Sequence, residues 1–229
     1  DAIAKSAPDG YTIGLYSIAS HAIAPTLYAK LPFDAEKDFT GIAMLWSVPN
    51  LLMVRLDFPA KTVPELIALA KSKPGGLDCA STGVGTVQHV TLELLNQRAG
   101  IKINHVPYKE MGAARNDLFA GRVPMQFGNV PGTVALRSAK EVTCMVHTGP
   151  KPVEVLPGVP AMAETLPGFE TWEWNGVFAP AGTDPALIAP AALTLLFTIF
   201  GATPRELTTA LAVYGAAAPA GGTAGVFLG

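Results

Sequence analysis

The sequence has 229 residues, of which 49% are hydrophobic and 15% are charged, and its formal net charge is −2 at pH 7. A chain of this length can form one large domain or two modest ones, each with a hydrophobic core. The near-neutral charge excludes the basic surface typical of nucleic-acid binding and the strong acidity typical of a disordered chain.

The first part of the chain predicts strands followed by a capped helix. Residues 11–17 alternate apolar and small side chains, and residues 46–56 form an apolar run that Pro49 interrupts near its start. Both patterns predict strands. Residues 62–65, Thr-Val-Pro-Glu, supply a hydroxyl cap, an early proline and an acid in the first turn, which predict a helix start. We expect that helix to end at the proline and glycines of residues 73–76.

The next segment predicts a strand, a glycine-rich loop and a helix in succession. Residues 77–81 form a short apolar strand that leads into ASTGVGTVQH, residues 80–89. The helix after this loop is expected to end just before Gly100. Its predicted buried face follows the helical spacing of four apolar residues: Val87, Val90, Leu94 and Leu95.

Strands and helices continue to alternate through residue 148. The patterns predict strands at residues 103–108, 123–129 and 142–148, and helices at residues 111–122 and 131–139. This alternation predicts an α/β fold with a mainly parallel sheet and right-handed crossovers. Such sheets bind ligands at the carboxyl ends of their strands, so four loops are expected on one rim, after residues 17, 80, 107 and 127.

The glycine loop has three interpretations. Thr86 or Ser81 could cap the helix, with the glycines serving only the turn. A phosphate site is disfavoured, because neither the Lys-Ser/Thr of a P-loop nor the third glycine of a dinucleotide fingerprint is present. A carboxylate could instead bind to free backbone N–H groups at the positive end of the helix. The sequence leaves the first and third interpretations open.

No catalytic or metal-binding motif is present in the sequence. The four histidines are far apart: His21, His89, His105 and His147. We expect His89 to be a neutral partner in a local hydrogen bond rather than a general base, whereas His21 could contact a ligand or complete a turn. The two cysteines, Cys79 and Cys144, have no metal or redox spacing and are predicted to be buried free thiols.

Six ordered motifs carry a resemblance to a known family. They are APDGYT, LPFD, PAKTVPEL, STGVGTVQH, HVPYK and APAGT, and the similar region runs from about residue 4 to residue 188. In this order the motifs resemble the periplasmic substrate receptors of tripartite tricarboxylate transporters, the Bug-type binding proteins. Any one of the motifs alone would be weak evidence.

The resemblance implies a bilobed type II periplasmic-binding-protein fold with two α/β lobes and a ligand cleft between them. The first lobe would comprise residues 1–48 with 172–229, and the second lobe residues 49–171. The implied function is capture of a small carboxylate (a dicarboxylate, an acidic amino acid or an aromatic acid) and its delivery to the transporter's membrane subunits. We expect a periplasmic monomer with no enzymatic activity, cofactor, metal or nucleic-acid partner.

The family's ligand-binding residues carry over to matching positions of this sequence. Family members hold the carboxylate through backbone amides, small hydroxyl groups and ordered water rather than through arginine. The implied ligand-binding residues are Ser17, Ser20, His21, Ser81, Thr82, Gly83, Gly85, Thr86, Tyr108, Lys109, Asn129 and Trp174.

The sequence departs from the family pattern in four places. No residues match the family's first strand and loop or a signal peptide, so the first lobe is expected to lack its start. Gly128 stands where many relatives have Asp, which favours a ligand without an amino group, and Glu110 replaces a glycine after Tyr-Lys. Residues 185–229 are poor in charge; within them residues 186–203 are uncharged, and we expect a buried helix there rather than a membrane anchor.

Two other functions fit parts of the pattern. One is an effector-sensing domain of a transcriptional regulator, which can share the bilobed fold but requires a DNA-binding module. The other is a transferase or hydrolase that uses the glycine loop as an anion hole. A secretory signal in the full gene product and a test for turnover would distinguish them from a receptor.

Overall fold

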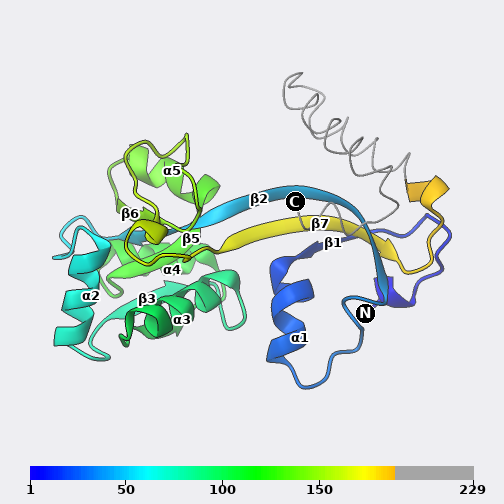
Figure 1. Ribbon diagram of the computed structural model, residues 1–229, viewed down its shortest axis with the longest axis horizontal. Helices are drawn as coiled ribbons and strands as arrows, with labels where there is room; N and C mark the ends of the chain where they lie inside the picture. The colour runs from blue at the N-terminus through cyan, green and yellow to red at the C-terminus, as the bar shows by residue number, and fades with distance from the viewer. Residues whose placement is uncertain (189–229) are drawn as a thin grey trace. The chain divides into compact units, whose positions relative to one another are not determined.

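The computed structural model describes residues 1–188, which form a mixed α/β fold (Figure 1). The chain divides into two compact units. The first consists of Asp1–Ser47 together with the segment that starts at Trp174, and the second is Val48–Glu173. The charge-poor segment expected at residues 185–229 lies, beyond residue 188, outside the described residues.

The first unit is built around two paired strands. β1 (Gly14–Ser17) runs antiparallel to β7 (Trp172–Pro180), which in turn neighbours β2 (Phe39–Val54). A short 3-10 helix, η1 (Ile3–Lys5), precedes β1. After β1, the π-helix η2 (Ala19–Ile23) continues directly into α1 (Ala24–Leu27). The apolar core of this unit contains Ile42, Ala43, Val177 and Ala179.

β2 is longer than the sequence pattern predicted, and Pro49 does not interrupt it. Its pairing with β5 (Met125–Asn129) begins at Asn50, and its pairing with β6 (Thr143–His147) begins at Leu51. Pro49 therefore precedes both ladders, and its missing N–H group removes no hydrogen bond from either of them. The expected interruption was wrong for this reason.

The second unit contains a five-stranded part of the sheet in the order β6-β2-β5-β3-β4. Its remaining strands and helices follow the predicted alternation: α2 (Val63–Ser72), β3 (Asp78–Ser81), α3 (Val87–Ala99), β4 (Asn104–Pro107), α4 (Met111–Phe119), α5 (Val130–Ser138) and η3 (Met162–Glu164). β3 pairs parallel with β4 and β5, as predicted. β2 is antiparallel to both of its neighbours in this unit, because it enters the sheet at the end where β5 finishes.

The core of the second unit lies on both faces of the sheet. On one face Leu52, Phe127 and the helices α2 and α3 form the larger apolar cluster, and on the other face Met53 and Ala80 pack against α4. Alternate residues of β2 thus belong to different clusters, as the period of a strand requires.

The buried face of α3 differs from the predicted one. Val90 is 40% exposed, whereas the buried residues of the helix are Val87, Gln88, Thr91, Leu92 and Leu95. Two of these five residues, Gln88 and Thr91, are polar, so the spacing of apolar residues in the sequence does not predict their burial. The predicted end of the helix is confirmed, because Gly100 adopts a left-handed conformation at the C-cap.

Both cysteines are free, as predicted; Cys79 is buried and Cys144 is partly buried. Burial raises the pKa of the Cys79 thiol to about 12. In the part of the chain that the structure describes, no helix combines the length and the apolar character needed to span a membrane.

Candidate functional site

The glycine loop connects the end of β3 with the start of α3 in the second unit. Thr86 is the N-cap of α3, and its hydroxyl accepts a hydrogen bond from the His89 N–H group at 3.4 Å. Gly83 and Gly85 have φ angles of 130° and 81°, which a residue with a side chain rarely adopts. A Cβ atom on Gly83 would lie 3.8 Å from the Tyr108 carbonyl oxygen, so the loop runs beside the end of β4.

Several backbone donors of the loop are hydrogen-bonded within it. The Gly83 N–H donates to Ser81 Oγ at 3.1 Å, the Gly85 N–H to His89 Nδ1 at 3.3 Å, and the Thr86 N–H to the Gly83 carbonyl at 3.4 Å. Within residues 1–188, the N–H groups of Val87 and Gln88 have no acceptor. The donors left for a ligand therefore include those of the first turn of α3, whereas the N–H groups of Gly83 and Gly85 are used within the loop.

Ser81 and two histidines hold the shape of the loop. Ser81 is 1% exposed, and its Oγ lies 2.5 Å from His105 Nε2. The His105 ring stacks on the His89 ring with centroids 4.0 Å apart. Burial lowers the pKa of His105, which favours its neutral form. The expected role of His89 in a local hydrogen bond is confirmed by its contact with Gly85.

A hydrogen-bonded chain connects two of the predicted ligand-binding residues. Thr82 Oγ1 donates to Gln88 Oε1 at 3.4 Å, and Gln88 Nε2 donates to Glu173 Oε2 at 3.1 Å. The Asn129 side chain also faces Glu173 and opposes the rise in the pKa of its carboxyl group, and Asn129 Oδ1 caps α5 by accepting from the Gly132 N–H. Gln88 and Glu173 thus bring the loop and the end of β5 together.

Sequence reasoning singled out neither Gln88 nor Glu173. Gln88 is only 3% exposed in the structure. The signal available in the sequence was a polar residue in the first turn of a predicted helix. Glu173 is partly buried, and this burial raises the pKa of its carboxyl group, while the hydrogen bonds from Asn129 and Gln88 oppose the rise. Both of these hydrogen-bond donors are neutral amides.

Asn50 adds a fully buried amide to the same region. It pairs with Asn129 across β2 and β5, so the two side chains lie on the same face of the sheet. Its backbone N–H donates to Thr148 Oγ1 at 2.8 Å. Its side-chain oxygen and nitrogen are buried without a hydrogen-bond partner among the described residues. We call Asn50, Gln88, Asn129 and Glu173 the carboxyl–amide cluster.

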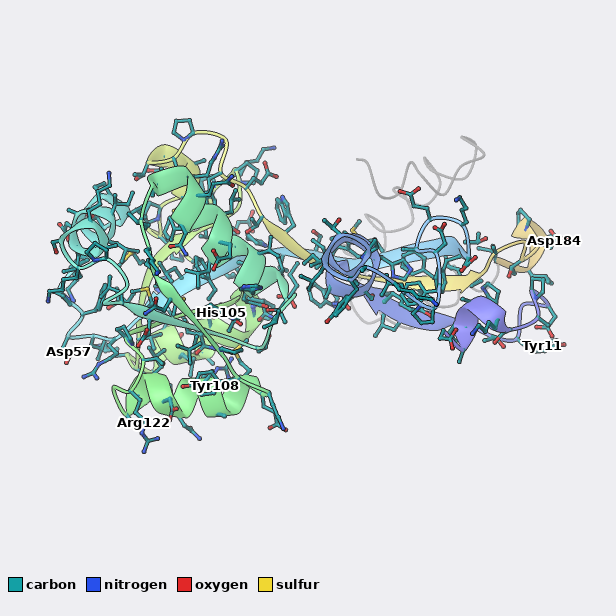
Figure 2. All side chains as sticks on the ribbon, turned by 90° about the horizontal axis from the view of Figure 1, so that it is seen from below. Tyr11, Asp57, His105, Tyr108, Arg122 and Asp184 are labelled. Atoms are coloured by element: carbon teal, nitrogen blue, oxygen red, sulfur yellow. The ribbon has the colours of Figure 1, made fainter. Side chains whose placement is uncertain are left out.

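Tyr108 and Lys109 follow β4 beside the loop. The Tyr108 N–H donates to the Ser81 carbonyl at 2.9 Å, whereas its phenol donates to Asp117 Oδ2 at 2.7 Å on α4. Asp117 also pairs with Arg122, whose position near Tyr108 can be followed in Figure 2. The backbone of Tyr108 therefore adjoins the loop while its hydroxyl group bonds α4, and Lys109 is exposed.

The predicted residues of the first unit are described separately. Ser20 Oγ accepts from the Ser17 N–H at 3.1 Å and donates to the Ser17 carbonyl at 2.9 Å, which closes the turn after β1. The His21 ring packs 4.4 Å from Tyr16 and 4.5 Å from Phe178, between ring centroids, and its Nδ1 lies 3.3 Å from Ser20 Oγ. These are contacts of a turn and an aromatic cluster. Trp174, at the start of the second segment of this unit, is partly exposed.

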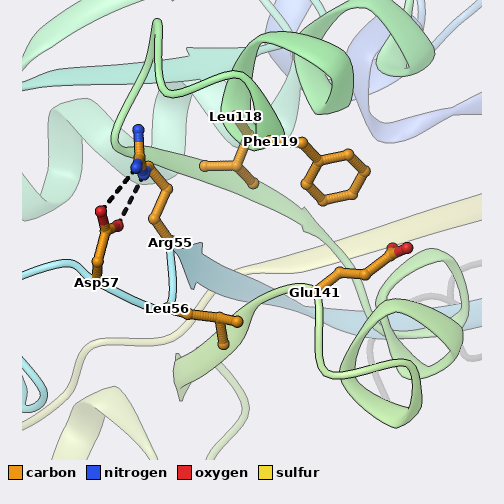
Figure 3. Close-up of a pocket in the computed structure, with 6 residues that line it drawn as sticks. All are labelled: Arg55, Leu56, Asp57, Leu118, Phe119 and Glu141. Carbon is orange, nitrogen blue, oxygen red and sulfur yellow. Dashed lines mark hydrogen bonds and ion pairs between the residues drawn. The ribbon is translucent and has the colours of Figure 1, made fainter.

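A cavity lies elsewhere in the second unit, and none of the predicted residues lines it. Its volume is about 220 Å³ (Figure 3), and its lining residues are Arg55, Leu56, Asp57, Leu118, Phe119 and Glu141. Arg55 directly follows β2, and its guanidinium binds both oxygens of Asp57 at 2.8 and 2.7 Å. The cavity therefore lies at the end of β2 that is remote from Asn50 and from the carboxyl–amide cluster.

The chain matches the family described as Tripartite tricarboxylate transporter family receptor over residues 1–195. It is 35% identical over 190 residues to the UPF0065 protein in the tcbD-tcbE intergenic region of Pseudomonas sp. (strain P51), covering 82% of this chain and 56% of that protein. It is 34% identical over 191 residues to Protein BugT of Bordetella pertussis, covering 82% and 58%. The chain thus spans little more than half the length of these curated relatives.

Solved structures give the same result. MatC from Rhodopseudomonas palustris, with bound malate, matches with a TM-score of 0.76 and 30% identity, covering 92% of this chain and 71% of that chain. An R. palustris protein solved with adipate matches with a TM-score of 0.76 and 28% identity, covering 95% and 80%. Together with the likeness to periplasmic binding protein BugD, these matches confirm the expected fold. The chain belongs to the tripartite tricarboxylate transporter receptor family, a family of solute-binding proteins rather than enzymes.

Proposed function

We propose that this chain is the ligand-binding part of a receptor that captures a small carboxylate in the periplasm and delivers it to the membrane subunits of a tripartite tricarboxylate transporter. In this proposal residues 1–48 with 172–229 and residues 49–171 are its two lobes. The carboxylate binds at the start of α3, between the glycine loop and the end of β5. The protein acts without catalytic turnover.

The observation that carries this proposal is the unpaired first turn of α3. The N–H groups of Val87 and Gln88 have no acceptor within residues 1–188, and they have the partial positive charge of a helix N-terminus, which stabilises an anion. The side chains of Ser81 and Thr82, which hydrogen-bond within the loop, carry no charge. Main-chain amides would then provide most of the interaction with the ligand's oxygen atoms.

The relatives make dicarboxylates the first ligands to test. MatC carries malate, and a second R. palustris protein carries adipate. At the end of β5, Gly128 is buried, and a Cβ atom there would come 2.8 Å from Met53 Cε. An Asp at this position would require the Met53 methyl group to move. The glycine that stands there supplies no carboxylate to pair with a ligand ammonium group, which supports a ligand without an amino group.

A panel of acids tests the proposal by titration calorimetry. The panel consists of malate, succinate, adipate, aspartate, glutamate and benzoate, with adipamide as the uncharged counterpart of adipate. We expect at least one dicarboxylate to bind, and adipamide not to bind. A ligand present at a hundred times its Kd should also stabilise the folded protein by about 2.7 kcal/mol. Binding of no acid, or equal binding of the amide, would contradict the proposal.

A matched pair of variants tests the location of the site. Thr82→Val keeps the shape of the side chain but removes the hydroxyl that donates to Gln88, and we expect about tenfold weaker binding. The control is Thr143→Val at the start of β6, which lies at the opposite end of the sheet and should bind like the wild type. Equal affinity of both variants would move the site away from the glycine loop.

A further inference from the structure

The carboxyl–amide cluster places an acid beside the proposed carboxylate site. Glu173 accepts from Gln88, whose own backbone N–H is one of the two free donors of the first turn of α3. A carboxylate bound to that turn, with the Gln88 side chain beside it, would therefore be close to a second carboxyl group. Two carboxylates in contact in a partly buried site cannot both be ionised without a large repulsion.

Among residues 1–188, no positively charged group is bonded to Glu173 that could offset this repulsion. The groups that face it from α3 and from the end of β5 are the neutral amides of Gln88 and Asn129. The ionisable residues nearest to it in its own segment and nearest to Gln88 on α3 are Glu170, which precedes β7 and accepts from the Trp172 indole, and His89, whose Nδ1 accepts from the Gly85 N–H. Within residues 1–188, no ion pair includes Glu173.

The orientation of the two amides is fixed by their other hydrogen bonds. Gln88 Oε1 accepts from Thr82, and Asn129 Oδ1 accepts from Gly132, so each amide directs its NH₂ group at Glu173. A carboxylate has about four acceptor positions on its two oxygens, so these two donors leave room for a proton. The amide of Asn50, opposite Asn129, is a further buried polar group in this region, and it has no partner among the residues that the structure describes.

We propose that Glu173 is a ligand-binding residue that takes up one proton from solvent when the carboxylate binds, and donates it in a hydrogen bond to the ligand. This inference rests on the proposed function. The step is balanced: an ionised Glu173 and a ligand carboxylate combine with one proton, and the O–H···O⁻ pair keeps the single negative charge. The site thus selects acids by sharing a proton with them instead of by pairing them with a cation.

Burial supports the inference, because it already raises the pKa of the Glu173 carboxyl group before any ligand is present. A nearby anion raises this pKa further. At pH values above the pKa of Glu173 in the unliganded protein, carboxylate binding must therefore be accompanied by proton uptake, and the affinity for the carboxylate must fall as the pH rises.

Calorimetric titrations with malate and adipate between about pH 6.5 and 8.5 test this, since aliphatic acids are fully ionised there. The measurements are made in PIPES and in Tris, because a proton taken up from the buffer adds the buffer's ionisation enthalpy to the measured heat. For the wild type we expect uptake approaching one proton per ligand and a Kd that rises by up to tenfold per pH unit.

Three variants complete the test. Glu173→Gln keeps an acceptor for Gln88 and Asn129 and carries no charge, so it should bind with no proton uptake and with less than a twofold change in Kd over this range. Glu173→Ala leaves both amides unpaired and should bind more weakly at every pH. Glu154→Gln removes an exposed carboxyl group of the same unit and should behave like the wild type.

The outcomes separate the two proposals. Binding of malate or adipate without proton uptake, or an unchanged pH dependence in Glu173→Gln, overturns the role of Glu173 and leaves the receptor function standing. Binding of aspartate but of neither diacid would instead indicate an ionised Glu173 paired with a ligand ammonium group, which also overturns it. Binding of no acid at any pH contradicts both proposals.

Discussion

The residues that surround the glycine loop are polar and buried. Ser81 is 1% exposed and Gln88 is 3% exposed, and both have their polar atoms hydrogen-bonded to neighbours. Asn50 is fully buried and has no such partner among the described residues. Burial of an unpaired amide costs about 1–3 kcal/mol, so a polar group that is retained at this position is expected to serve the site.

His21 provides a pH-dependent prediction for the first unit. Burial among aromatic rings lowers the pKa of His21 from 6.5 to about 4. Because the pKa is lower in the folded state, stability is lost as the pH falls from 6.5 through 4. The shift corresponds to at most about 3 kcal/mol, and solvent around the half-buried ring reduces it to about 1–2 kcal/mol.

The measurement is urea unfolding of the wild type and His21→Phe at several pH values between 7 and 4. Other groups titrate in both proteins, so the quantity to follow is the difference in free energy of unfolding between them. This difference should shift in favour of the variant as the pH falls. Tyr28→Phe removes an exposed hydroxyl of the same unit, leaves His21 and its contacts in place, and should follow the wild type. A constant difference between wild type and His21→Phe would show that His21 is not protonated in this range.

Helix ends were predicted closely from the sequence, because capping depends on residues adjacent in the chain. At the start of α2 the Thr62 hydroxyl accepts from the Glu65 N–H at 3.4 Å, and Glu65 Oε2 accepts from the Lys61 N–H at 2.7 Å. Thr86 caps α3, in agreement with one interpretation of the glycine loop, and Gly100 ends that helix. These contacts need no tertiary structure.

A substitution of the N-cap residue of α2 tests whether this local contact stabilises the helix. We expect Thr62→Ala to lower the free energy of unfolding by about 0.5–1 kcal/mol, because the Glu65 N–H loses its acceptor. Ligand affinity should not change, since α2 connects the end of β2 to the start of β3, away from the glycine loop. Ser72→Ala, in the last turn of α2, is the control and should lie within about 0.5 kcal/mol of the wild type. A loss of ligand affinity in Thr62→Ala would contradict this prediction.

Two elements were mispredicted for tertiary reasons. The buried face of α3 includes Gln88 and Thr91, and each is buried because it bonds a residue distant in sequence, Glu173 and Thr171 respectively. β2 passes through Pro49 because its ladders with β5 and β6 begin after that residue. Apolar periodicity detects neither effect, since both depend on partners supplied by the fold.

At the scale of the molecule, the second unit is continuous in sequence while the first is not. The three apolar clusters of the second unit consist entirely of residues between 48 and 173, and so do its strand ladders. We therefore expect a fragment of residues 48–173 to fold alone. Urea unfolding followed by circular dichroism should give one cooperative transition with an α/β spectrum.

The matched control is the same fragment with Phe127→Ala. Phe127 is fully buried in the larger apolar cluster, so its truncation should cost about 3–5 kcal/mol and shift the transition to lower urea. A fragment that shows no cooperative transition, or a transition insensitive to this substitution, would mean that the second unit depends on the rest of the chain.

The sequence by itself determined the family, the alternation of strands and helices, the helix caps and the glycine loop, because each is encoded in short contiguous patterns. The tertiary structure decided which donors remain free for a ligand, since the glycine amides turn inward to Ser81 and His89 and leave the first turn of α3 open. It also decided that Glu173 meets Gln88 and Asn129. Those partners lie far apart in the chain, and only the folded sheet brings their polar atoms within hydrogen-bonding distance.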